Sequence, residues 1–288
     1  MKTYVISSGA PEALTSHLLS QQPKSLPIAE LAWIDLLGNP NVVLPDGSQH
    51  KLAGKTAALI ALIAIEGAPS CQRVAGMLWP ESPESLARNN LRTLRHRLTR
   101  RFGVELIENG EQLSISLQAA TSQPWNADEL AAALIADGVE RCTLLADINL
   151  LQLEQFQDWL MIARQRVTQQ QLSTLDTALS VAMNNGQIAH ALDYARACVV
   201  LEPLCERWHR QLMHTHMACG DRAAALAAYG ACKKILLDNF GVTPDDRTLK
   251  LQLSIIGNEL CDKPSGTAQL STVESAVLTR RNLQLERL

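Results

Sequence analysis

The segment ARNNLRTLRHRLTRRFG, residues 87–103, holds six arginines and one histidine but no acidic residue, in a chain of net charge −3. On a helical wheel its apolar residues gather along one side: Ala87, Leu91, Leu94, Leu98 and, near the edge, Phe102. Its polar residues gather on the opposite side: Asn89, Arg92, Thr93, His96 and Arg100, flanked by Arg88 and Arg97. The pattern predicts a helix with one buried face and one face of long donors that has no acidic partner on the same helix.

A helix of this kind fits the major groove of double-stranded DNA. Arginine can donate two hydrogen bonds to guanine, asparagine can bond two atoms of adenine, and the remaining cations neutralise phosphates. Because the whole chain is slightly acidic, any nucleic-acid surface must be local. The alternative is a solvated helix face whose arginines pair with acids from elsewhere in the chain.

The residues before this segment predict small strands followed by two short helices. Between residues 30 and 53, apolar runs are broken by Gly-Asn-Pro and Pro-Asp-Gly, which is typical of strands joined by turns. Residues 55–67 have apolar side chains at helical spacing and end at a glycine. Residues 70–79 predict a second helix, which ends at Pro80.

The basic segment itself predicts a third helix over residues 83–102. Ser82 is a plausible N-cap, Pro83 stands at the first helical position and Gly103 ends the helix. Two alternating runs around Asn109-Gly110 then predict a hairpin. Strands, three helices and a hairpin are the element order of a winged helix, in which the third helix reads DNA.

The second half of the chain predicts an acidic domain of repeated helices. Residues 119–261 carry 11 basic and 16 acidic side chains. NNGQIAHALDYARACVVLEP, residues 184–203, aligns with ACGDRAAALAAYGACKKILLD, residues 218–238, at an offset of 34. Glycines 186 and 220 and several alanines coincide, and 34 is the period of tetratricopeptide repeats. A chance match of two alanine-rich helices is the alternative.

Composition restricts the class of protein further. A length of 288 residues allows two domains, and 47% hydrophobic with 19% charged residues is normal for a globular protein. The seven cysteines are scattered without a CxxC pair, which favours a reducing compartment over a disulfide framework. No signal peptide and no membrane span of roughly 20 apolar residues is recognisable. We therefore expect a cytoplasmic protein without membrane contact.

Two motifs suggest other chemistry but lack necessary residues. LAGKTAALIAL, residues 52–62, resembles the end of a phosphate-binding loop, but the glycine required at position 49 is Gln49. Lys55 is instead expected to open the first helix and to contact the DNA backbone. The group His209, His214, His216 and Cys219 lacks the spacing of a compact metal-ligand set. We predict no metal site, no cofactor and no catalytic residues, so the chain is not expected to be an enzyme.

The first half of the chain resembles a known family. Residues 51–103 look like the OmpR-type winged helix of bacterial transcriptional activators of the antibiotic-regulatory-protein (SARP) type, most specifically in LWPESPESLARNNLR and RHRLTRRFG. The second half is similar to the tetratricopeptide-like bacterial transcriptional activator domain that follows this winged helix. ACGDRAAALAAYGACKKILLDNFGVTPDDRTLKLQ, residues 218–252, resembles its last repeat.

The resemblance implies a mainly α protein with a small α/β winged-helix domain and an all-α repeat domain. We place an extension at residues 1–28, the DNA-binding domain at 29–118, the activator domain at 124–261 and a tail or linker at 262–288. The resemblance further implies sequence-specific binding to double-stranded DNA through residues 83–102, dimers or multimers on promoter repeats, and recruitment of RNA polymerase or its sigma factor.

Two features depart from the family pattern. Arg95 stands where an apolar side chain is usual, with Leu94 taking the core role one place earlier. Glu108 and Glu111 flank the hairpin turn, where a basic residue would reach the minor groove. An alternative function is a protein-interaction or signal-sensing module, and the tail AVLTRRNLQLERL, residues 276–288, looks like the segment that leads into the ATPase module of longer regulators.

Overall fold

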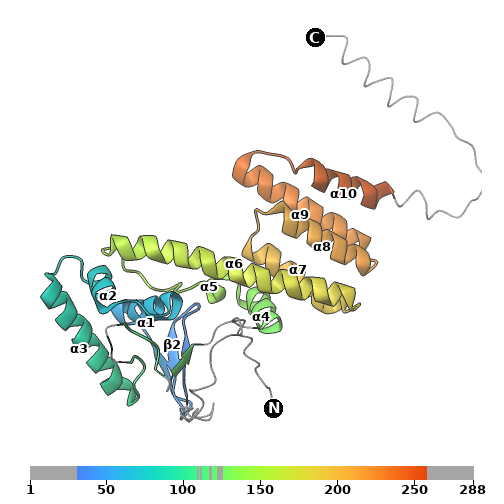
Figure 1. Ribbon diagram of the computed structural model, residues 1–288. Helices are drawn as coiled ribbons and strands as arrows, with labels where there is room; N and C mark the ends of the chain where they lie inside the picture. Colours follow the sequence, from blue (N-terminus) through green and yellow to red (C-terminus); the bar gives the residue numbers. More distant parts are fainter. Residues whose placement is uncertain (1–30, 109, 111, 117–118, 122–125, 258–288) are drawn as a thin grey trace, which may run out of the picture. The chain divides into compact units, whose positions relative to one another are not determined.

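The computed structural model in Figure 1 describes residues 31–108, 110, 112–116, 119–121 and 126–257. The predicted extension 1–28, the tail 262–288 and the turn residues Asn109 and Glu111 lie outside the described residues. The chain divides into two compact units, residues 1–201 and 202–288. Each unit is considered by itself below.

The first unit begins with a small sheet. Strands β1 (Ala32–Asp35), β2 (Asn41–Val43) and β3 (Gln49–Lys51) form an antiparallel meander. Strand β4 (Ala119–Thr121) joins the edge of β1 in parallel, which gives the order β3-β2-β1-β4. Strand β4 was not predicted, because a three-residue strand of Ala-Ala-Thr has no alternating pattern of its own.

Three helices follow the meander, as predicted. Helix α1 (Gly54–Glu66) ends at Gly67, whose φ of +85° is a conformation that glycine adopts readily. In helix α2 (Cys71–Leu78), the first turn is capped by the Ser70 hydroxyl, which accepts from the backbone N–H of Arg73. In α1, residues 57–63 are all buried, so this helix lies at the centre of the winged-helix core.

Helix α3 (Glu84–Phe102) starts one residue later than predicted. Pro83 has φ −52° and ψ 147°, an extended conformation, so it precedes the helix and Ser82 is not its N-cap. The first helical hydrogen bond runs from the Ala87 N–H to the Pro83 carbonyl. Glu84 then occupies the first turn, where a negative charge is favourable. The predicted end is confirmed, because Gly103 adopts the left-handed conformation there.

The predicted hairpin is confirmed by backbone pairing on both sides of the turn. The Glu108 N–H donates to the Ser114 carbonyl at 3.0 Å, and the Ser116 N–H donates to the Leu106 carbonyl at 3.0 Å. Ile107 and Ile115 form a bridge between these two segments. We call residues 104–116 the wing.

Helix α6 (Glu154–Asn184) joins the winged helix to the helices that follow it. Phe156, Leu160, Ala163 and Val167, in its first half, are buried in the same core as α1, α2 and α3. Its second half packs on α4 (Ala127–Asp137) and α7 (Ile188–Leu201). In Figure 1 this long helix runs from α2 past α5 (Val139–Cys142) to α7.

The second unit consists of α8 (Glu206–Ala218), α9 (Arg222–Phe240) and α10 (Asp246–Gly257) around a core that includes Met213, Tyr229 and Ile255. Arg222 donates to the carbonyls of Ile255 and Ile256, which lie near the end of α10. This contact satisfies carbonyls that have no partner within the helix.

The predicted 34-residue repeat is confirmed at its turns. Gly186 and Gly220 have φ of +71° and +74°, and each ends a helix of a helix pair. Equivalent hydrogen bonds follow them: the Gln187 N–H donates to the Ala182 carbonyl at 2.8 Å, and the Asp221 N–H donates to the His216 carbonyl at 2.9 Å. Alanines 191 and 225 are both fully buried, so they allow close helix packing in each pair.

We predict that Phe156→Ala destabilises the first unit strongly. The Phe156 side chain is fully buried and stacks on Trp159 with ring centroids 5.3 Å apart. Because truncation leaves a cavity, the free energy of unfolding should fall by about 3–5 kcal/mol, measured by urea denaturation followed by circular dichroism. Met161→Ala, on the exposed side of α6, is the control and should change it by less than about 0.5 kcal/mol. Equal effects of the two substitutions would contradict the shared core.

Candidate nucleic-acid interface

The exposed face of α3 carries the residues predicted to bind DNA. Ala87, Leu91, Leu98 and Phe102 are buried in the core, and Leu94 is half-buried against it. The structure places all seven predicted helix residues at the surface: Arg88, Asn89, Arg92, Thr93, His96, Arg97 and Arg100. The predicted division of the helix into two faces is therefore confirmed.

One arginine on this face has an acidic partner on the same helix, contrary to the prediction. Arg88 Nη2 lies 2.5 Å from Glu84 Oε1, one turn earlier. The basic segment defined from residue 87 onward excluded Glu84, and the pairing was missed for that reason. Both side chains are more than half exposed, so this ion pair contributes little stability and solvent screens it.

Three arginines of α3 keep their charge available. Arg92, Arg97 and Arg100 form no ion pair or hydrogen bond with any residue in the described part of the chain. Arg101 differs, because it donates to the Lys51 carbonyl at 3.2 Å and lies over the Phe102 ring. Arg101 thus fixes α3 against β3.

Arg95 links α3 to the wing. Its Nη2 donates to the Glu108 carbonyl at 2.9 Å, and its side chain is half-buried. Leu94 was predicted to take the core position that an apolar residue usually holds at position 95. Leu94 does pack against the core. Arg95 faces the wing instead. An apolar side chain at this position could not make the hydrogen bond to the Glu108 carbonyl.

The wing is also held from its other side. The Leu113 N–H donates to the Pro69 carbonyl at 2.9 Å, and the Cys71 thiol donates to the Gly110 carbonyl at 3.3 Å. On the wing itself, the exposed carboxylate of Glu108 accepts from the Ser114 hydroxyl. The described wing residues include no cation, so this hairpin presents negative charge.

Lys55 lies in the first turn of α1, as predicted. Its Nζ is 4.9 Å from the centroid of the Trp79 ring, an arrangement typical of a cation–π contact. Partial burial lowers the pKa of Lys55 from its usual value. The ring holds the ammonium group beside the connection between α2 and α3.

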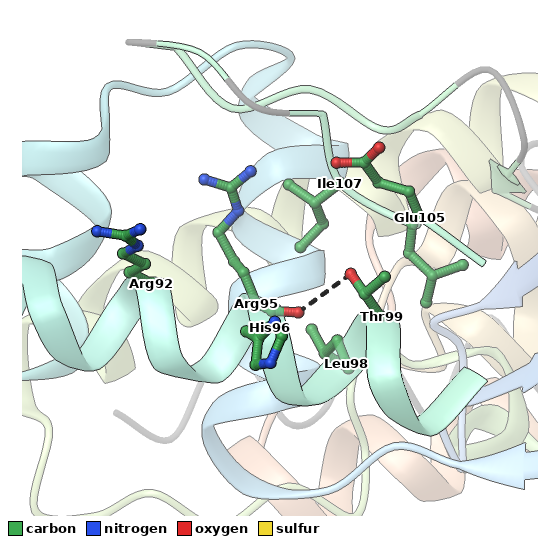
Figure 2. Close-up of a pocket in the computed structure, with 8 residues that line it drawn as sticks. Arg92, Arg95, His96, Leu98, Thr99, Glu105 and Ile107 are labelled. Carbon is green, nitrogen blue, oxygen red and sulfur yellow. Dashed lines mark hydrogen bonds between the residues drawn. The ribbon is translucent and has the colours of Figure 1, made fainter. Parts of the chain in front are cut away.

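A pocket of about 290 Å³ lies between α3 and wing residues 105–107 (Figure 2). Leu98, Leu106 and Ile107 supply its apolar lining. Its polar lining consists of Arg92, Arg95, His96, Thr99 and Glu105. Sequence reasoning missed Glu105 and the pocket, because the pairing of the wing with α3 depends on contacts between distant residues.

The histidine group in the second unit is not a compact cluster. His209 is buried, and its Nε2 donates to the Pro203 carbonyl at 2.8 Å, whereas His214 and Cys219 are exposed. In the described residues no three His, Cys, Asp or Glu side chains lie together as a metal site would need. No helix in the same residues is long and apolar enough to span a bilayer.

Comparison with known proteins agrees with this architecture. Residues 129–256 match the family model of the bacterial transcriptional activator domain. Regulatory protein AfsR of Streptomyces coelicolor is 28% identical over 244 residues, which are 80% of this chain and 24% of that protein. AfsR of Streptomyces griseus is 27% identical over 217 residues, or 69% of this chain and 22% of that protein. The chain thus spans about a quarter of the length of these curated relatives.

Among solved structures, Mycobacterium tuberculosis EmbR in complex with a low-affinity phosphopeptide is similar in fold. The TM-score is 0.50 at 16% identity, over 87% of this chain and 69% of that one. The chain thus combines a winged helix with a domain found in bacterial transcriptional activators. The family match and the likeness to AfsR support a bacterial transcriptional regulator of the SARP type.

We predict that Arg95→Ala loosens the wing. Loss of the hydrogen bond to the Glu108 carbonyl should make the paired amides of Glu108 and Ser116 exchange about tenfold faster, since a charge-assisted bond contributes about 1.5–3 kcal/mol. Hydrogen–deuterium exchange with mass spectrometry measures this rate. Arg97→Ala, which removes an equal charge from the same helix, should leave it unchanged. Unchanged exchange in both variants would contradict the clamping role of Arg95.

Proposed function

We propose that the chain is a sequence-specific DNA-binding activator of transcription. It binds repeats in promoter DNA through α3, as a dimer or multimer, and recruits RNA polymerase or its sigma factor. The observation that carries this proposal is the exposed face of α3, where Arg92, Arg97 and Arg100 have no partner in the described part of the chain.

The composition of this face suits base recognition. Asn89 is exposed one turn from Thr93, and Arg100 is exposed two turns further along the same side. Asparagine pairs with adenine and arginine with guanine, while threonine can donate, accept or contact the methyl group of thymine. Side chains of these three types can thus contact base edges as well as phosphates.

The rest of the surface restricts how DNA can approach. The net charge of the chain is −3, so long-range attraction to DNA depends on the cations gathered on α3. Lys55, held beside the connection between α2 and α3, is our proposed contact to the DNA backbone. The acidic wing supports a binding mode in which α3 provides the main contact and the wing stays out of the minor groove.

The two domains divide the work in this proposal. Residues 29–118 bind DNA, and residues 124–261 mediate self-association or contact with the transcription machinery. The family match over residues 129–256 supports the second assignment. We propose no chemical reaction, cofactor or metal for either domain.

We predict that Arg92→Ala together with Arg100→Ala weakens DNA binding at least about tenfold, because each lost base or phosphate contact costs about 1–3 kcal/mol. The binding site is first selected from a random DNA pool, and affinity is then measured by fluorescence anisotropy. Lys233→Ala with Lys234→Ala removes two exposed cations from α9 and is the control for net charge. Equal affinities of the two double variants would exclude α3 as the reading helix.

We further predict that the affinity of the intact protein for its selected site falls steeply between about 50 and 200 mM salt. Cations on α3 release counterions from each phosphate that they neutralise, so log K declines linearly with log salt concentration. The spacing of repeats in the selected DNA reports the geometry of the oligomer. A flat salt response would favour a protein-interaction module that does not bind DNA.

A further inference from the structure

We propose that the pocket between α3 and wing residues 105–107 binds one phosphodiester of the DNA backbone, with Arg92 as its donor. This inference rests on the proposed function of α3 in DNA binding. It divides the exposed residues of α3 into those that contact phosphate and those that read bases. Arg92, which the helical wheel groups with the base-reading face, is assigned to phosphate.

The position of Arg92 on the helix supports this division. Arg92, Arg95 and Thr99 lie at spacings of three and four residues, so they share one flank of α3. In Figure 2 the guanidinium groups of Arg92 and Arg95 extend from α3 on the side that holds wing residues Glu105 and Ile107. Asn89, Thr93 and Arg100 are exposed but do not line the pocket.

The charges around the pocket fit a single anion at one end. Arg92 lies at one end of the lining, and Arg95 stands between Arg92 and the carboxylate of Glu105 (Figure 2). The hydrogen bond from Arg95 to the Glu108 carbonyl holds the wing against α3 along the pocket. Because Glu105 repels an anion, a phosphate is favoured at the end that holds Arg92.

The location of the pocket favours DNA backbone over a base edge. When a helix lies in the major groove, the edge of that groove is a sugar–phosphate backbone, with the minor groove beyond it. A cleft between the reading helix and the wing therefore lies against this backbone. Arginine suits the site, because its planar donors match two phosphate oxygens at once.

The first test compares Arg92→Ala with Asn89→Ala in the full chain, on the selected duplex and on an unrelated duplex of equal length. Arg92→Ala should weaken binding to both duplexes by a similar factor, about tenfold, and reduce the salt slope by about 1. Asn89→Ala should weaken binding to the selected duplex only and relax the preference at one base pair. Arg92→Lys, which keeps the charge, should restore most of the affinity for both duplexes.

Ethylation interference locates the phosphate. Ethylation of one phosphate per bound copy should weaken binding of the wild-type protein, and the same ethylation should not affect the Arg92→Ala protein further. Glu105→Gln should tighten binding to both duplexes about threefold, because it removes a repulsive charge from the pocket. Glu108→Gln is the matched control three residues along the wing and should change affinity less.

Two results would overturn the assignment, and they differ from failure of the proposed function. If Arg92→Ala relaxes the preference at one base pair, or leaves the ethylation pattern unchanged, Arg92 does not bind phosphate in this pocket while α3 still reads DNA. If the wild-type protein binds neither duplex, DNA binding by α3 is itself wrong and the phosphate assignment falls with it.

Discussion

The packing of the first half of α6 against the winged helix is the contact on which the first unit depends. Phe156 and Leu160 share one core with α1 and α3, so α3 and the first helices of the matched activator domain belong to the same compact unit. Glu66, at the end of α1, accepts two hydrogen bonds from Arg73, and these contacts hold the pKa of that carboxyl below its usual value. Because the core is closely packed, a shift of the first half of α6 would also displace side chains that pack on α3.

The six arginines of the basic segment have different roles, although the sequence presents them as one cluster. Arg95 holds the wing and Arg101 holds β3, so their charges stabilise the domain as well as adding to its field. Arg88 is paired with Glu84 at an exposed position, and it can exchange that partner for a phosphate at little cost. Arg92, Arg97 and Arg100 remain for direct contacts. A count of basic residues therefore overstates the number of cations that have no partner in the described residues.

Local signals explain what could be predicted from the sequence. Gly67, Gly103 and Gly220 end helices because glycine readily adopts positive φ there, and leucines at helical spacing identified the buried face of α3. The start of α3 was wrong by one residue, because Pro83 suits both the first helical position and the extended residue before it. Strand β4 and the pocket depend on pairing between residues far apart in sequence, which periodicity does not report.

The small number of available cations bears on the proposed oligomer. With Arg92, Arg97 and Arg100 as the main charges, one copy neutralises few phosphates, and the acidic remainder of the chain adds repulsion. Affinity from phosphate contacts scales with their number, so a single copy would hold DNA only weakly at cellular salt. Two copies on adjacent repeats double these contacts, and association between them makes the second binding event effectively intramolecular. Under the proposed function, weak binding by one copy would provide specificity, because an isolated half-site would not retain the protein whereas a correctly spaced pair would.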